Sequence, residues 1–199
     1  GASCLKASIE AGKVVTLEHV STIADGTAVK TPGTRIFPYL CKNLDDVITI
    51  PDEELVVAFL DRVENHKMVV ENSGLLTVAA LKHLKVKGKK VVSILSGGNM
   101  DVITMSSVVQ QGLIMRDRIF TVSVLLPDKP GELSHVADVI ARQNGNVIKL
   151  EHNQFVSINR SAAVELRITL EAFGTEHKHQ IIQALEQNGY KPKLVRTNI

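Results

Sequence analysis

The stretch IFTVSVLLPDKPGEL, residues 119–133, decides the fold of the C-terminal part of the chain. Apolar and polar side chains alternate over residues 120–126, and this period of two predicts a half-buried β-strand. Residues 128–132 then carry a proline and a glycine directly before an apolar pattern of helical spacing, which predicts that a helix begins there. The stretch is therefore typical of a strand that turns at once into a helix.

Further along the chain the same reasoning gives four more elements. The first helix should end at Asn144-Gly145, because glycine readily adopts the left-handed backbone that stops a helix. Strands are expected over 147–152, 162–170 and 193–196, and a second helix over 175–188. The order βαββαβ predicts a ferredoxin-like antiparallel sheet with both helices on one face, forming a domain over residues 118–199.

Upstream, residues 1–117 show a different pattern. Helices are expected over 3–11, 51–67 and 74–84, and strands over 46–50 and 89–95, with a short extended piece at 68–70. Strands that alternate with helices indicate an α/β sheet, but such a sheet usually needs about four strands or more. We therefore expect this segment to be part of a larger α/β domain, completed by residues before Gly1 or by another chain.

The composition excludes several classes of protein. The 199 residues include 23 basic and 21 acidic side chains, and the longest apolar run, 55–60, is far shorter than the roughly 20 residues of a membrane span. Cys4 and Cys41 stand far apart without metal-ligand spacing, which favours reduced thiols, a cytoplasmic location and no metal site. The lysine cluster 82–90 lacks stacking aromatic residues, so nucleic acid is not an expected partner.

The segment Leu95-Ser96-Gly97-Gly98-Asn99 follows the predicted strand 89–95. Ligands of open α/β sheets bind at the carboxyl ends of strands, and paired glycines let backbone amides approach a bound group. A two-glycine turn alone is more often structural, and neither a GxGxxG nor a GxxxxGK pattern is complete here. Glu71 could equally be an ordinary carboxylate at a strand end, and Asp25-Gly26 an ordinary turn.

Four segments in this order, 22–33, 44–47, 69–74 and 96–99, resemble the C-terminal half of the catalytic domain of threonine ammonia-lyases. These are pyridoxal-phosphate enzymes of the tryptophan-synthase-β fold type, and the resemblance covers nearly all of residues 1–118. It implies conversion of L-threonine to 2-oxobutanoate and ammonia. Serine racemases and serine dehydratases share the motifs and remain an alternative.

The resemblance also implies roles for individual residues. Ser96 would make a hydrogen bond at the pyridine nitrogen of the cofactor, within the turn formed with Gly97, Gly98 and Asn99. A neutral hydroxyl does not hold that nitrogen protonated, which suits β-elimination. Asp25 and Gly26 would line the cofactor ring, and Glu71 would lie near the same pocket.

Two family elements are missing from the sequence. No lysine stands in the Ser-x-Lys-x-Arg-Gly context of the Schiff-base lysine, and the longest glycine run has two residues instead of the family's phosphate-binding glycine loop. In the family both elements lie upstream of the matching region. The chain is therefore expected to be a C-terminal fragment without a catalytic residue of its own, inactive by itself.

Residues 118–199 resemble an ACT domain, a sensor of amino acids, through the segment 126–133. Unpaired amides at the helix start near Gly131 could receive a ligand carboxylate. Candidate effector-binding residues are Asp128, Gly131, Glu132, Leu133, Asn146 and Val147, although Asp128 could instead cap the helix. ACT domains often pair, so a homo-oligomer, dimer or tetramer, is expected. The alternative function is a regulatory amino-acid-binding module without catalysis.

Four histidines have no expected role in chemistry. His177 and His179 are two residues apart on a predicted helix, so they face different sides and make a poor metal pair. His135 and His152 are isolated. All four are expected at the surface or in an interface.

Overall fold

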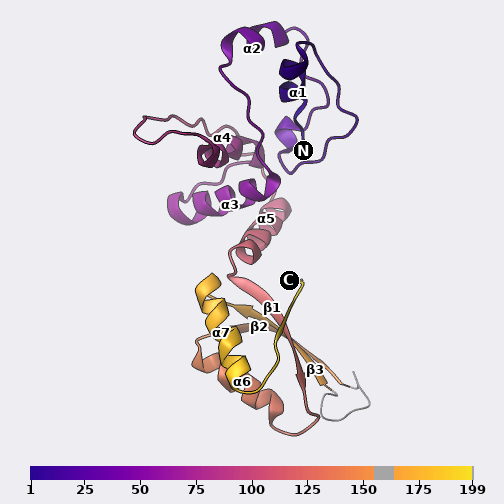
Figure 1. Cartoon of the computed structure of the whole chain (residues 1–199), viewed down its shortest axis with the longest axis vertical. Helices are drawn as coiled ribbons and strands as arrows, with labels where there is room; N and C mark the ends of the chain where they lie inside the picture. Colours follow the sequence, from indigo (N-terminus) through magenta and orange to yellow (C-terminus); the bar gives the residue numbers. More distant parts are fainter. Residues whose placement is uncertain (155–163, 199) are drawn as a thin grey trace. The chain divides into compact units, whose positions relative to one another are not determined.

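The computed structural model describes residues 1–154 and 164–198, and the chain divides into two compact units, Gly1–Val109 and Gln110–Ile199 (Figure 1). The division falls inside helix α5 (Val102–Met115), upstream of the boundary that the sequence pattern suggested at 117/118. The reason is that Met105 and Val108, in the first half of α5, pack into the core of the first unit. None of the described helices is long and apolar enough to cross a membrane.

The second unit has the element order that the sequence pattern predicts. Four strands and two helices follow one another as β1 (Ile119–Leu126), α6 (Glu132–Arg142), β2 (Asn146–Asn153), β3 (Val164–Glu171), α7 (Thr175–Gln187) and β4 (Lys193–Val195). The sheet has the order β2-β3-β1-β4, and every neighbouring pair is antiparallel. Residues 162 and 163 of the expected third strand lie outside the described residues.

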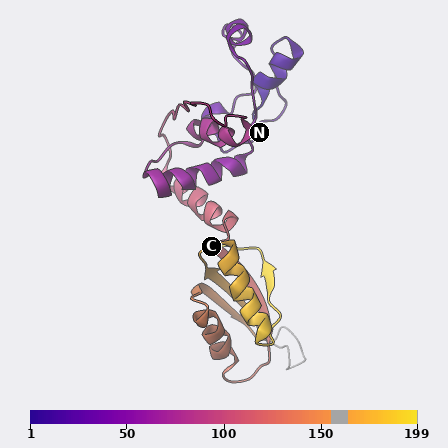
Figure 2. The ribbon, with the colours of Figure 1, turned by 60° about the vertical axis from the view of Figure 1, so that its left-hand side comes forward.

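The alternation of apolar and polar residues along β1 and β3 explains why this sheet forms a core on one side. Val122, Leu166 and Ile168 are almost completely buried and pack with the apolar faces of α6 and α7 in one cluster. Both helices therefore cover the same face of the sheet (Figure 2). Thr121 and Thr169 point the opposite way along their strands and lie on the other face, which none of the described helices covers.

The segment between α5 and β1 is anchored on α7. The carboxylate of Asp117 accepts hydrogen bonds from Lys178 Nζ at 2.7 Å and from Thr175 Oγ1 at 2.8 Å. These bonds, that of Lys178 first, hold the pKa of Asp117 below its ordinary value. The short charged segment between α5 and β1 is therefore fixed to α7 at Asp117.

The first unit contains helices and irregular segments. Its α-helices are α1 (Cys4–Ala11), α2 (Phe37–Asn43), α3 (Asp52–Asp61), α4 (Leu76–Ala79) and the first half of α5; η1 (Asp25–Thr27), η3 (Asn72–Leu75) and η4 (Ala80–His83) are 3-10 turns. The sequence did not predict α2 and α5, and the expected helix over 74–84 is instead the broken series η3, α4 and η4. Leu55, Phe59 and Leu75, each fully buried, form the centre of the core.

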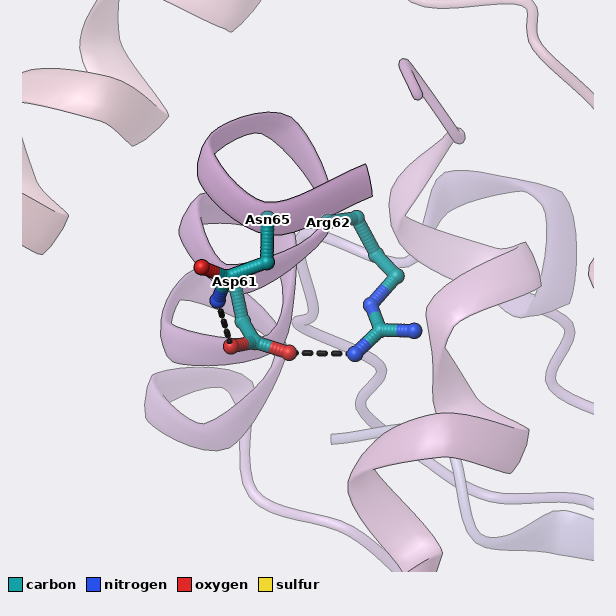
Figure 3. A network of polar contacts seen from close by, with 3 residues as sticks. All are labelled: Asp61, Arg62 and Asn65. Carbon is teal, nitrogen blue, oxygen red and sulfur yellow. Dashed lines mark hydrogen bonds and ion pairs between the residues drawn. The ribbon is translucent and has the colours of Figure 1, made fainter. Parts of the chain in front are cut away.

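Helix α3 begins where its sequence favours a helix start. Pro51 precedes it, and three acidic residues in its first turn complement the positive end of the helix dipole. The helix continues into a π turn, η2 (Arg62–His66), and Lys67 then takes a left-handed backbone with φ of 57°. Figure 3 shows the contacts at this junction, where Asp61 pairs with Arg62 and accepts a hydrogen bond from Asn65 Nδ2 at 2.6 Å.

The expected strands over 46–50, 68–70 and 89–95 are wrong for this structure, in which these residues are irregular. A strand is held by hydrogen bonds with a neighbouring strand, and no described segment of the first unit supplies such a neighbour. The side chains of the segment 89–95 are accordingly not covered by a neighbour: Val92 is 89% and Ile94 is 71% exposed.

The expectation that all four histidines lie at the surface or in an interface is wrong for His177. Its side chain is buried, Nδ1 accepts the backbone N–H of Phe173 at 3.1 Å, and Nε2 donates to the carbonyl of Gln143 at 2.5 Å. The ring also stacks on Phe173, with 4.7 Å between ring centroids. His177 therefore ties the start of α7 to the end of β3 and to the residue that follows α6.

We expect His177→Ala to lower the free energy of unfolding of the second unit by about 2 kcal/mol, because a backbone donor and a backbone acceptor lose their partner. The measurement is urea unfolding followed by circular dichroism. His179→Ala is the matched control, since His179 is exposed on the same helix. Equal stability of the two variants would contradict this role.

Candidate functional sites

The carboxylate of Glu71 lies against the Ser96–Asn99 turn. Its Oε2 accepts the backbone N–H of Asn99 at 3.1 Å, and the backbone N–H of Glu71 donates to the carbonyl of Gly97 at 3.4 Å. Two of the segments singled out in the sequence, 28 positions apart, thus meet directly. Glu71 fixes the backbone of the turn that carries Ser96.

Glycines make this close approach possible. Gly97 has a φ of +79°, and a Cβ built on it would lie 2.3 Å from the carboxyl carbon of Glu71. A Cβ on Gly74 would lie 2.0 Å from the carbonyl oxygen of Ser96. Neither position has room for a side chain, so the turn and the segment 71–74 form one packed unit.

The Asp25-Gly26 loop reaches the same place. A Cβ on Gly26 would lie 2.9 Å from Ser73 Oγ and 3.5 Å from Glu71 Oε1. Asp25 Oδ1 accepts the N–H of Gly26 at 2.9 Å, so the carboxylate of Asp25 stabilises its own turn. The structure therefore brings Gly26, Glu71 and the Ser96 turn together.

Two residues for which the sequence predicted no role at this site hold this loop in position. Asp52, the first residue of α3, accepts hydrogen bonds from Thr22 Oγ1 at 2.6 Å and from the N–H of Ile23 at 2.9 Å. Asn72 Nδ2 donates to the carbonyl of Ile23 at 3.0 Å. These partners are 29 to 49 positions apart, so no local sequence signal could have indicated them.

Polar atoms at this site remain available. Asn72 is 3% exposed, and its Oδ1 and the hydroxyl of Ser73 are buried without a hydrogen-bond partner among the described residues. Ser96 is exposed, and its hydroxyl makes no hydrogen bond within the same part of the chain. A neutral donor and acceptor therefore stands at the surface of the glycine turn, where a bound molecule could use it.

The second candidate site is a cavity of about 310 Å³ beside the β1–α6 loop. Four of the predicted effector-binding residues, Asp128, Gly131, Glu132 and Leu133, line it, and so does His152. Gly131 itself occupies the N-cap position of α6 with a φ of 94°, and no side chain among the described residues caps this helix. The alternative role of Asp128 as a helix cap is therefore wrong.

Asn146 and Val147 do not line this cavity. They begin β2, where Asn146 pairs with Glu171 at the end of β3 and donates from Nδ2 to Glu171 Oε2 at 3.1 Å. The cavity lies near His152, six residues further along β2, which corresponds to roughly 20 Å at about 3.3 Å per residue. Within one copy of the chain these two predicted residues are thus separated from the other four, because β2 carries them to the opposite end of the sheet.

Tyr190 and His135 are neighbours that the sequence did not connect. Tyr190 OH and His135 Nδ1 are 2.5 Å apart. Burial raises the pKa of Tyr190, and the negative charge of Glu132 raises it further, so the phenol stays protonated. Tyr190 therefore supplies a neutral hydroxyl beside the first turn of α6.

Within residues 1–154 and 164–198 there is no group of three or more His, Cys, Asp or Glu side chains that could hold a metal ion.

Residues 1–97, which include most of the first candidate site, match the family model for pyridoxal-phosphate dependent enzymes. The first unit is thus similar to this class of proteins, and the similarity points to pyridoxal phosphate as the cofactor.

Particular relatives are more informative. The chain is 36% identical to the L-threonine ammonia-lyase of Geobacter sulfurreducens over 92% of this chain and 46% of that protein. It is 33% identical to the L-threonine ammonia-lyase of Thermotoga maritima over 95% of this chain and 47% of that protein. The chain spans about half the length of these curated relatives.

A solved structure agrees with these relatives. The processed form of threonine deaminase isoform 2 from Solanum lycopersicum superimposes with a TM-score of 0.52 and 28% identity, over 56% of this chain and 34% of that one.

Proposed function

We propose that this chain forms part of a pyridoxal-phosphate dependent threonine ammonia-lyase, which converts L-threonine to 2-oxobutanoate and ammonia. The observation that carries the proposal is the contact of Glu71 with the glycine turn, with the Asn99 N–H 3.1 Å from Oε2. Two segments that resemble the family thereby meet in space. The 36% identity to a curated threonine ammonia-lyase over 92% of the chain supports the same function.

The exposed hydroxyl of Ser96 is the group that we assign to the ring nitrogen of the cofactor. When bound, the cofactor would stabilise the negative charge that develops at the α-carbon of the substrate. Ser96 is neutral, so it can orient the ring nitrogen by a hydrogen bond without supplying a full charge. This limits the withdrawal of electrons into the ring and favours loss of the β-hydroxyl over transamination.

Glu71 has a positioning role in this proposal. Its carboxylate occupies the space beside Gly97 and accepts the Asn99 N–H, and through these contacts it sets the position of Ser96. Asn72 and Asp52 then hold the 22–26 loop against the same turn. The lysine that binds the cofactor and its phosphate site would come from a segment outside this chain, which is why we expect the chain alone to be inactive.

For the second unit we propose an ACT domain of ferredoxin-like topology over residues 118–199, which binds an amino-acid effector in the β1–α6 cavity. The βαββαβ order and the left-handed backbone of Gly131 at the helix start support this proposal. Pairing of these domains in a cytoplasmic homo-oligomer is part of the same proposal.

We expect Gly131→Val to abolish the response to the effector, because a branched side chain is strained at a φ of 94° and would occupy the open space at the helix start where the effector would dock. The measurement is calorimetric titration with isoleucine, valine, threonine and serine. Gly189→Val is the matched control, since Gly189 has a similar φ of 85° and lies outside the cavity. Unchanged effector binding in the Gly131 variant would show that the effector does not bind in the β1–α6 cavity.

The catalytic proposal is tested by the formation of 2-oxobutanoate from L-threonine by the intact enzyme that contains this chain. Pyridoxal-phosphate dependent turnover of L-threonine is the expected result. A protein that binds the cofactor and turns over serine but not threonine would replace the proposal with the serine dehydratase or racemase alternative.

A further inference from the structure

The face of the second unit's sheet that lies opposite α6 and α7 is hollowed. A cavity of about 210 Å³ lies over it, and the side chains that surround it belong to β1, β2, β3 and the C-terminal segment. Six of the lining residues have charged or hydroxyl side chains: Thr121, Lys149, Glu151, Arg167, Thr169 and Arg196. The β1–α6 cavity has a different lining, so the two are separate sites.

The floor of this hollow is a pair of threonines on the two central strands. Thr121 and Thr169 stand directly opposite each other, and their hydroxyl oxygens are 3.0 Å apart. They are only 6% and 4% exposed. One hydrogen bond between two hydroxyls uses one of their two protons, and no acceptor for the other proton is found among the described residues. The floor therefore offers a buried donor to an occupant.

The walls of the hollow are predominantly positive. Lys149, Arg167 and Arg196 line it, against the single carboxylate of Glu151. Lys149 Nζ lies 2.8 Å from Glu151 Oε1, and Arg167 Nε lies 3.1 Å from Glu165 Oε1.

These pairs leave several donors available. Arg167 lines the hollow, and its ion pair engages Nε, which leaves its terminal nitrogens as potential donors. Arg196 is exposed and has no ion pair within the part of the chain that the structure describes. Two guanidinium groups, one ammonium that pairs with Glu151 and the threonine pair thus line the same hollow.

We propose that this hollow binds a small dicarboxylate. Three cationic side chains face one anionic side chain in its lining, and Glu165 pairs with Arg167 from outside the lining, so the positive charge of Arg196 stays uncompensated beside two paired cations. Planar guanidinium groups pair with carboxylates through two parallel hydrogen bonds, and the threonine floor donates a further one. The β1–α6 cavity fits such a ligand less well, because Asp128 and Glu132 line it against one cation, Lys129.

The proposal is tested by calorimetric titration of the full chain with succinate at low ionic strength, where surface charges are least screened. Arg196→Gln should weaken succinate binding by about tenfold, the effect of one charge-assisted hydrogen bond. Lys191→Gln, which removes the same charge from an exposed position outside the lining, should leave succinate binding unchanged.

Two further variants test the floor of the hollow and separate this site from the effector site. Thr169→Val should weaken binding while the chain keeps its circular dichroism spectrum, because only the hydroxyl of the floor is removed. Gly131→Val should leave succinate binding unchanged, so that failure of the effector site and failure of this site are distinguishable. Equal losses in the Arg196 and Lys191 variants, or binding of acetate or inorganic phosphate as tight as that of succinate, would overturn the proposal.

Discussion

Replacing Gly97 with alanine should lower kcat/KM of the intact enzyme for L-threonine by at least about 100-fold, because a displacement of about 1 Å in catalytic geometry has effects of this size. Two independent features give this expectation. The backbone of Gly97 has a φ of +79°, which side chains disfavour, and its Cβ would lie 2.3 Å from the carboxyl carbon of Glu71. Glu71 would have to move away and lose the Asn99 N–H, so the turn that carries Ser96 would shift.

The control for this experiment is Gly88→Ala. Gly88 has nearly the same backbone angle, +77°, but a Cβ there meets nothing within 4 Å. It therefore carries the strain of a left-handed backbone without the collision. We expect a modest loss of stability and no loss of turnover in the Gly88 variant. Similar kinetics of the Gly97 and Gly88 variants would show that the contact with Glu71 has no catalytic consequence.

Ser96→Ala should lower kcat by about tenfold while the fold stays intact, because one hydrogen bond to the cofactor is lost. The hydroxyl of Ser96 is exposed and unbonded within the described residues, so its removal disturbs no internal contact. The measurement is steady-state formation of 2-oxobutanoate together with a thermal melt. Ser106→Ala, an exposed serine on α5, is the control. Turnover of the Ser96 variant equal to that of the control would contradict the proposed hydrogen bond between Ser96 and the ring nitrogen of the cofactor.

The sequence predicted the second unit well because each of its elements carries a local signal. The alternation over 120–126 predicted β1, and the apolar spacing that starts at Leu133 predicted α6. The location of His177 could not be predicted in this way, because its partners, Phe173 and Gln143, come from the end of β3 and the end of α6.

The first unit was harder to predict for a physical reason. The segment 89–95 has the composition of a buried strand, but composition supplies no neighbour to pair with, and Val92 is 89% exposed. Helix α2 contains a proline within its first turn, and Val102 and Ile103 of α5 are exposed, so neither helix shows a clear apolar face. The local sequence pattern therefore gave wrong predictions where strand pairing and tertiary contacts decide the structure.

The candidate site was predicted in part. Ser96, Glu71 and Gly26 were identified from motifs, and the structure brings their segments together. Asn72 and Asp52 were missed, since each acts through contacts with the 22–23 segment, about 30 to 50 positions away.

A crystal structure of the intact enzyme with pyridoxal phosphate bound tests the role of Ser96 directly. The distance to measure is that between the ring nitrogen of the cofactor and Ser96 Oγ. We predict a hydrogen bond of about 2.7–3.2 Å, with the Glu71 carboxylate still accepting the Asn99 N–H. A ring nitrogen that pairs with a carboxylate, or a cofactor bound away from the Ser96 turn, would contradict it.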